Sequence, residues 1–322
     1  MPSPSSSLAS QRSDLGGSLM EFDLAMDAAG FIAHRVLAVF DAAVQAGNYG
    51  KIPIEQLLQE RDTERAPGSG YSRGNFTFDP LTYSCEEHGA EEPVDDREAK
   101  MYADYFDAEL VATMRAFSAV LRNAEKRAAD ALFNATTFSA TAITNEWDDA
   151  ANAVPITDVE ASVLRVYAAS GLWPNALIIN RKTFRNLRNC DQVIDRINSA
   201  GAGNASKPSD VTEQMLAEVF DLEHIMVGGG SRNSATEGQT ATPVQIWSDE
   251  YAMVARIAVT NDIREPCVGR TIHWSGDGSS VDGRVESYRD ETVRSDIMRV
   301  RHDVDEVIHY VAAADLMSNI TT

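Results

Sequence analysis

Basic residues are scarce in this chain of 322 residues, which carries 28 Lys and Arg against 49 Asp and Glu, a formal net charge of −21. A surface of that sign repels phosphate backbones, which argues against a protein that reads nucleic-acid sequence. Arginine greatly outnumbers lysine among the cations. Because guanidinium groups pair with carboxylates in a bidentate way, this bias suits contacts between acidic subunits, and a genome-wide codon bias explains it equally well.

Cysteine is also rare. The three residues, Cys85, Cys190 and Cys267, are far apart and show no C-x-x-C spacing, which argues against a disulfide framework or a structural zinc site and fits a reducing cytoplasm. No apolar run reaches the ~18 residues that span a bilayer. The first residues, Met1 to Ser18, lack the apolar core of a signal peptide and are expected to form a disordered or loosely anchored arm.

Patterns that carry catalysis or cofactor binding are missing. The glycines at 228–230 follow an apolar run, but no phosphate-loop motif surrounds them, so a tight or flexible loop is expected. His302, Asp303 and Asp305 are interpreted as a solvated strand edge rather than metal ligands. The acidic run 86–96 is expected to be a solvated loop before a helix, with a divalent-ion site as the weaker alternative. We therefore expect no enzyme, and no catalytic, cofactor-binding or metal-binding residue.

The clearest positive signal is a long helix from Asp95 to Phe133. Apolar residues recur there at steps of three or four, no Gly or Pro interrupts them, and Asp95 or Asp96 is placed to cap the start. At ~1.5 Å per residue the helix would be roughly 55 Å long, which favours a spine for a flat, extended molecule over an ordinary core helix or a coiled coil.

Residues 51–95 are unusual because they are polar and rich in proline. A flexible run at 66–74 contains three glycines, and alternating residues follow it, at Asn75 to Phe78 and again at Leu81 to Cys85. Alternation predicts half-buried strands. Such an excursion has little chance of forming a core alone, so we expect it to need a partner surface on this chain or on a neighbour.

The remaining patterns alternate helix and strand in the middle of the chain and turn to strands after Arg270. From Glu21 to Ala46 the spacing first favours helix and then loosens after Val36. The other predicted helices run from a Thr157 or Asp158 cap to Ser170, through Phe184 to Ile197, and from Thr212 to Phe220. The predicted strands are 175–180, 224–227, 244–247, 252–259, 270–274, 285–288, 297–301 and 307–311.

Four stretches carry a resemblance to a known family: 31–50, 83–96, 173–187 and 224–249, the last with Trp247 and Asp249 close together. Their order is similar to that of the major capsid proteins of tailed bacteriophages, whose fold encapsulin nanocompartments share. The resemblance implies an α+β fold with an arm that is largely extended after Val36. The implied divisions are an N-terminal arm (1–50), an extended β-hairpin loop (51–95), a peripheral domain with the spine helix (96–175), an axial domain (176–268) and returning peripheral strands (269–322).

The resemblance implies a structural virion protein that assembles into pentamers and hexamers, forming an icosahedral head around double-stranded DNA without sequence-specific binding. It implies assembly in the host cytoplasm, no cofactor, and as partners other copies of the chain, a portal, a separate scaffolding protein and, optionally, a decoration protein. Some members crosslink subunits through a lysine on the extended loop. The loop tip here has no lysine and Lys51 lies at its base, so we expect no crosslink.

The extended loop supplies the candidate contact residues. We expect it to lie across a neighbouring subunit near that neighbour's spine helix. The side chains expected to make the contact are Arg65, Arg73, Phe76, Phe78, Leu81 and Tyr83. Two other classes of function remain open: an encapsulin-like compartment around an enzyme cargo, and an uncharacterised α/β enzyme with a deep pocket.

Overall fold

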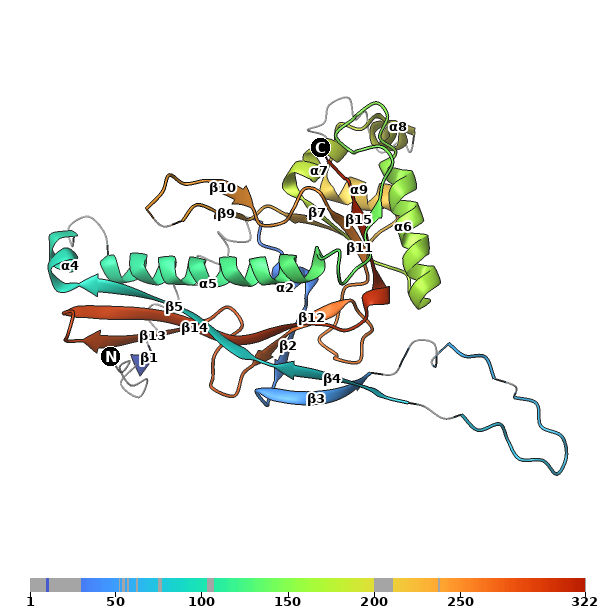
Figure 1. Cartoon of the computed structure of the whole chain (residues 1–322), viewed down its shortest axis with the longest axis horizontal. Coiled ribbons are helices and arrows are strands. Elements are labelled where there is room, and N and C mark those ends of the chain that lie inside the picture. Colours follow the sequence, from blue (N-terminus) through green and yellow to red (C-terminus); the bar gives the residue numbers. More distant parts are fainter. Residues whose placement is uncertain are drawn as a thin grey trace.

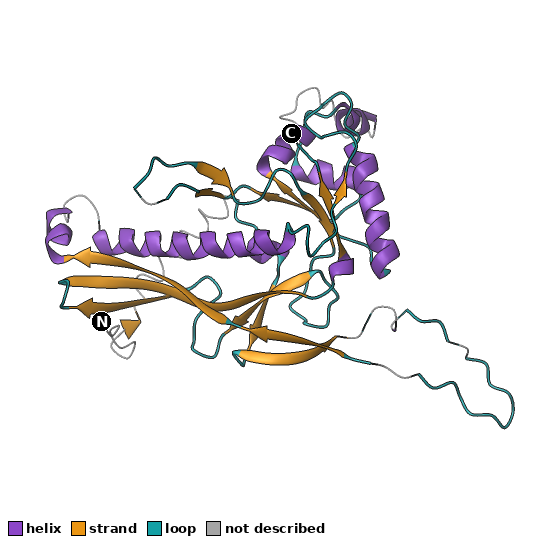
Figure 2. Cartoon of the chain, viewed as in Figure 1, coloured by secondary structure: helices purple, strands orange, loops and turns teal. Residues whose placement is uncertain are grey.

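The computed structural model describes residues 10–11, 30–51, 53, 56, 58–61, 63–74, 77–102, 107–199, 211–236 and 238–321. The molecule is elongated (Figure 1). A long helix lies along one sheet, a second sheet with its own helices stands at one end, and a hairpin-shaped loop projects beyond that end. Figure 2 shows a sheet with helix lying against it in each half, which agrees with the α+β fold that the resemblance implies.

The spine is shorter than the sequence pattern predicts, because the helix is broken. Helix α4 spans Asp96–Tyr102, and helix α5 spans Ala108–Leu132, with 25 residues or about 37 Å at ~1.5 Å per residue. Asp107 has an extended backbone, and its carboxylate accepts hydrogen bonds from the N–H groups of Glu109 and Leu110. An aspartate in this position caps a new helix. The prediction of one continuous helix from Asp95 is therefore wrong.

Helix α5 packs on the larger, six-stranded sheet. Its strand order is β1-β13-β14-β12-β2, and β5 also pairs with β14. Phe117 and its apolar neighbours on α5 form one core cluster with Val285, Met298 and Val300 of the sheet. The strands are β1 (Ser10–Gln11), β2 (Val39–Ala42), β5 (Glu86–Asp95), β12 (Gly269–Trp274), β13 (Arg284–Asp290) and β14 (Ser295–Ile308).

Strand β5 corrects the expectation of a solvated loop in the acidic run. All ten of its residues pair antiparallel with β14. Its carboxylates meet arginines on the elements around it: Glu91 lies 3.6 Å from Arg299, and Glu92 lies 3.6 Å from Arg115. Charged residues thus occupy the exposed and half-buried positions of a real strand, which follows β4 and leads directly into helix α4.

Strand β14 corrects two further expectations. It is one strand of 14 residues, where the sequence pattern predicts two. It lies inside the sheet, with β5 along one part and β13 and β12 as further partners. The side chains of His302 and Asp303 are consequently buried, and His302 Nδ1 donates to the backbone oxygen of Val281 at 2.8 Å. A solvated strand edge is wrong for this segment, because the sheet continues on both sides of it.

The N-terminal arm is extended after Val36, as the family resemblance implies. Helix α2 is a single turn, Ala33–Val36, and β2 then pairs parallel with β12. Strand β3 (Ala46–Lys51) pairs with β4 (Asp79–Ser84) at the base of the extended loop. The helix first expected from Glu21 falls largely outside the described residues.

The smaller sheet has five strands in the order β6-β15-β11-β7-β8. Both faces of the interior strand β7, which lies between β11 and β8, are buried, since Leu177 and Ile179 join one core cluster and Ala176 and Ile178 another. The strands are β6 (Thr141–Ala142), β7 (Ala176–Asn180), β8 (His224–Gly228), β11 (Ala252–Ala255) and β15 (Ala314–Ser318), with a short 3₁₀ helix η3 (Val311–Ala313) before β15. A separate hairpin joins β9 (Ser231–Asn233) to β10 (Pro243–Gln245).

Four helices cover one face of the smaller sheet, and they agree with the predicted helical segments. They are α6 (Pro155–Ser170), α7 (Arg181–Leu187), α8 (Asp191–Ser199) and α9 (Glu213–Phe220). Thr212 caps α9, and Gly171 ends α6 in the left-handed region at φ 69°. The predicted cap of α6 is wrong, because Val154 holds the cap position and Asp158 instead accepts a hydrogen bond from Trp147 Nε1 at 3.0 Å.

The division into domains remains a prediction. The five-stranded sheet and its helices include segments from both sides of the proposed axial domain, 176–268. Strand β6 and helix α6 precede that range in the chain, and β15 follows it.

One buried carboxylate joins the spine, the arm and the smaller sheet. Glu125 of α5 is 1% exposed, and it accepts hydrogen bonds from the N–H groups of Ile32 at 2.9 Å and Ala33 at 2.8 Å. It also accepts one from Trp247 Nε1, on the segment that leads to β11. Burial raises the pKa of Glu125, and the three hydrogen bonds oppose that effect. The side chain therefore caps α2 from another helix.

We predict that Glu125→Ala lowers the free energy of unfolding by about 3–5 kcal/mol, because three buried donors would lose their acceptor at ~1–3 kcal/mol each. Chemical denaturation of the purified subunit followed by circular dichroism measures this. Glu160→Ala on the exposed face of α6 is the matched control and should change stability by less than about 0.5 kcal/mol. Equal stabilities of the two variants would contradict the role given to Glu125.

Candidate assembly surfaces

The base of the extended loop packs on its own subunit. Leu81 and Tyr83 of β4 are half-buried, and Leu81 stands opposite Tyr49 in the β3–β4 register. The Tyr83 hydroxyl donates to the backbone oxygen of Val44 at 3.2 Å, and its ring centroid lies 6.2 Å from that of Tyr49. Two of the six predicted contact residues thus already have intramolecular neighbours.

The distal part of the loop spans residues 58–78, and its described residues, 58–61, 63–74 and 77–78, project from the body without strand pairing (Figure 2). Phe78 is 64% exposed, and Leu58 and Tyr71 are similarly exposed. The predicted strand at Asn75 to Phe78 is wrong for Thr77 and Phe78, because β4 begins only at Asp79; Phe76 lies outside the described residues. Large apolar side chains therefore stand in water where the chain has left its own core.

The tip of the distal loop is organised by Arg65. Its Nε donates to the backbone oxygen of Ser69 at 2.6 Å, and its guanidinium lies over the Tyr71 ring, 4.8 Å from the centroid. A turn brings Ser69 back, with its N–H bonded to Ala66 and Gly68 at φ 87°, a conformation that favours glycine. Arg73 is exposed on the returning side. The predicted contact residues Arg65 and Arg73 thus both face solvent at the far end of the loop.

Lys51 fixes the root of the loop. Its ammonium group donates to the backbone oxygen of His309 at 3.2 Å and lies 4.8 Å from the centroid of the Tyr310 ring. These contacts tie the end of β3 to the chain just after β14. The absence of a crosslink at this lysine stays a prediction.

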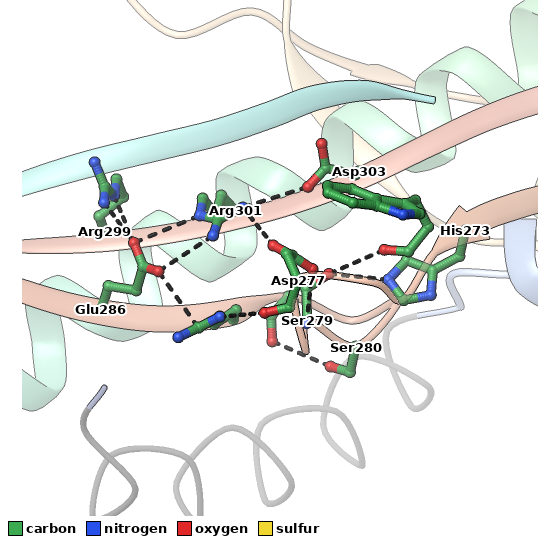
Figure 3. A network of polar contacts seen from close by, with 11 residues as sticks. His273, Asp277, Ser279, Ser280, Glu286, Arg299, Arg301 and Asp303 are labelled. Carbon is green, nitrogen blue, oxygen red and sulfur yellow. Dashed lines mark hydrogen bonds and ion pairs between the residues drawn. The ribbon is translucent and has the colours of Figure 1, made fainter. Parts of the chain in front are cut away.

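A buried network of charges stiffens the larger sheet beside the spine (Figure 3). Glu286 of β13 is 6% exposed, and it accepts hydrogen bonds from Arg299 Nε at 3.0 Å and from Arg301 Nη2 at 3.3 Å, with Arg284 Nε also at 3.3 Å. Arg301 continues the network to Asp277 at 2.7 Å. Burial alone raises the pKa of Glu286, but the arginine hydrogen bonds outweigh it and hold that pKa below its ordinary value.

A second set of polar contacts holds the N-terminal arm against this sheet. His273 of β12 contacts Asp41 of β2 through Nδ1 at 2.8 Å and Ser279 Oγ through Nε2 at 3.2 Å, beside a cavity of 430 Å³. The same order of contacts, from aspartate to histidine to serine, forms the catalytic triad of serine hydrolases. Here, however, the serine closes a turn, with its hydroxyl bonded to the backbone oxygen of Trp274 and its N–H to Asp277. No sequence pattern pointed to these contacts, because Asp41 and His273 are far apart along the polypeptide.

Two kinds of functional feature are absent from the part of the chain that the structure describes. It contains no group of three or more His, Cys, Asp and Glu side chains arranged to hold a metal ion. It also contains no helix with both the length and the apolar character needed to cross a bilayer. Gly228 packs against the ring of Trp247, where a Cβ atom would clash, so its lack of a side chain serves packing.

Comparisons with known proteins agree with this architecture. No family model matches the chain. The major capsid protein of Burkholderia phage BcepMu is 27% identical over 279 residues, which cover 84% of this chain and 86% of that protein. A phage-related protein from Bordetella bronchiseptica superposes with a TM-score of 0.70 at 20% identity, covering 97% of this chain and 98% of that one. A cyanophage capsid structure gives 0.59 at 10% identity, covering 88% and 86%.

The chain has the fold of phage major capsid proteins. The resemblance first seen in four stretches of sequence is thereby confirmed. Within this capsid fold, the described surface that stands furthest from the body is the distal loop, and the elements nearest its root are β3, β4 and the end of β14.

We predict that Glu286→Gln lowers the free energy of unfolding by about 3–5 kcal/mol at neutral pH, because three arginines would lose their buried counter-charge. The folded-state pKa of Glu286 lies below the ordinary 4.5, so its contribution is present above that value and is lost as the pH falls through the folded-state pKa. The difference in free energy of unfolding between wild type and variant should therefore become smaller as the pH is lowered.

Denaturation curves of both proteins between neutral and acidic pH measure this difference. Glu291→Gln is the matched control, since Glu291 is exposed and makes one ion pair, with Arg289 at 3.4 Å, worth ~0–1 kcal/mol. If the difference in free energy of unfolding between wild type and Glu286→Gln stays constant with pH, the charge of the carboxylate is not what stabilises the sheet.

Proposed function

We propose that this chain is the structural subunit of a phage head, and that it assembles into pentamers and hexamers that close an icosahedral shell around packaged DNA. Its role is structural rather than catalytic. The observation that carries the proposal is the distal loop, which leaves a body with the capsid fold and presents Phe78 and Tyr71 to water. A surface of that kind is covered in a shell, where every subunit has neighbours on all sides.

The distal loop lies across a neighbouring subunit near that neighbour's spine helix α5. Burying one large apolar side chain is worth ~1.5–3 kcal/mol, so Leu58, Tyr71, Phe76 and Phe78 together contribute enough to decide assembly. Leu81 and Tyr83 contribute less, because they are already half-covered within their own subunit. The exposed arginines at the tip add only ~0–1 kcal/mol each and mainly select the partner surface.

Packaged DNA is contained rather than bound. The net charge of −21 makes tight association with a free duplex unfavourable. The shell is built in the host cytoplasm with a separate scaffolding protein, it carries a portal and optionally a decoration protein, and its final location is the virion. A gel shift with submicromolar affinity at physiological salt would argue against containment alone.

We expect recombinant protein, with its scaffolding protein supplied, to sediment as megadalton particles that negative-stain microscopy shows to be closed shells. A protein that stays monomeric, or that forms only small oligomers with a ligand in a deep pocket, would contradict the proposed function. Shells that copurify with an enzyme cargo, and that contain no DNA when isolated from the native host, would favour the compartment alternative instead.

Deleting Arg65 to Arg73 should leave a folded, soluble subunit that forms no stable shells, because all of the removed residues are exposed and none belongs to a core cluster. Circular dichroism with a thermal melt checks the fold, and sedimentation checks assembly. Replacing the same residues with glycine and serine at equal length is the matched control that separates the reach of the loop from its side chains. A deletion that unfolds the monomer, or one that assembles like wild type, would count against an intersubunit arm.

A further inference from the structure

The two ends of the smaller sheet carry opposite charge. At the carboxyl end of β7, helix α7 begins with Arg181 and Lys182, and Arg185 follows one turn later. All three side chains are exposed, and they line a pocket of 340 Å³ together with Gln245. The ten residues from Arg181 to Cys190 contain four cations and no acid, in a protein where acids outnumber bases.

Intramolecular pairing neutralises only part of this basic end. Lys182 forms an ion pair with Asp249 at 2.8 Å. Among the described residues, Arg181 and Arg185 make no ion pair, and the Arg181 guanidinium lies over the Phe184 ring at 5.8 Å. Two exposed guanidinium groups therefore present free donors on one flank of the sheet.

The amino end of β7 and β8 holds the opposite charge. A groove of 1250 Å³ lies there between α6, α8 and α9. Five exposed acids line it, against two arginines, Arg196 and Arg256: the acids are Glu160, Asp195, Glu218, Asp221 and Glu223. The groove also has an apolar wall, since Trp173 is 57% and Leu164 is 53% exposed.

The two ends cannot meet within one subunit. Strands β7 and β8 are parallel, and Arg181 directly follows β7, whereas Trp173 precedes β7 and Glu223 precedes β8. Figure 1 accordingly shows α7 and α6 on opposite flanks of the smaller sheet. A contact between the two charges requires a second copy of the chain.

We propose that the basic end of one copy, Arg181 and Arg185, docks on the acidic groove of the next copy, at Glu218 and Glu223, within a pentamer or hexamer. This rests on the proposed function. A head-to-tail contact of two different patches generates a closed ring when its rotation closes. Charge complementarity fixes the register against the general repulsion of acidic subunits, and burial of Trp173 and Leu164 supplies the apolar contribution.

Charge reversal tests the proposal. Arg181→Glu with Arg185→Glu, and separately Glu218→Arg with Glu223→Arg, should each lower the yield of shells at least ten-fold while leaving the circular dichroism of the subunit unchanged. Combining all four substitutions in one chain should restore assembly, because complementary charges face each other again. Arg181→Lys with Arg185→Lys is the matched control that keeps the charge and should assemble like wild type.

Mixing the two reversed variants gives a second readout. The variant with Arg181→Glu and Arg185→Glu then has two acidic ends, and the variant with Glu218→Arg and Glu223→Arg has two basic ends. The two variants can therefore alternate around a hexamer, but a ring with an odd number of subunits, such as a pentamer, cannot close. We expect six-fold rings or open sheets without closed shells. Single reversals that assemble like wild type, a fourfold variant that does not recover, or closed shells from the mixture would each overturn the proposal. Failure of wild type to form shells would overturn the proposed function instead.

Discussion

The architecture depends on one carboxylate. Glu125 lies in the last third of the spine helix, and its two oxygens satisfy backbone donors of the arm and the indole of Trp247. A buried acid is costly, as the raised pKa of this one reflects, so it is tolerated only where several donors converge. The hydrogen bonds to Glu125 set the position of α2, from which the arm runs into β2 and β3. The extended loop begins at β3, so the direction in which it leaves the body follows from that contact.

Residues with a clear period were predictable. The apolar steps of α5, the buried run of β7 and the Thr212 cap of α9 all follow local rules that tertiary packing does not override. Strand β5 was not predictable in this way, because its acids fall in adjacent pairs without alternation, and its pairing along ten residues of β14 makes a strand of it. The break before α5 was missed for a related reason: Asp107 sits within an unbroken apolar pattern, and its capping role depends on backbone angles that the pattern does not encode.

The candidate assembly surfaces were likewise predictable only in part from the sequence. The glycine and proline content of residues 51–95 was enough to predict an excursion that needs a partner. It could not divide that excursion into a base held by Tyr49 and Val44 and a distal part that leaves large side chains such as Tyr71 and Phe78 mostly exposed. The charged ends of the smaller sheet were beyond sequence reasoning, because Glu160, Arg181 and Glu218 are separated along the chain and meet or oppose one another only through the parallel order of β7 and β8. Both surfaces face away from the core, and the two charged ends of the smaller sheet are complementary to each other, as the proposed shell of identical subunits requires.

The central claim is that the distal loop reaches a neighbour. A cryo-electron microscopy reconstruction of assembled particles, at a resolution that traces side chains, tests it most directly. The account predicts density for residues 58–78 running across the spine helix α5 of the adjacent subunit, with Phe78 and Tyr71 covered there. Density for the same residues folded back on their own subunit, with the neighbour's spine helix left uncovered, would contradict it.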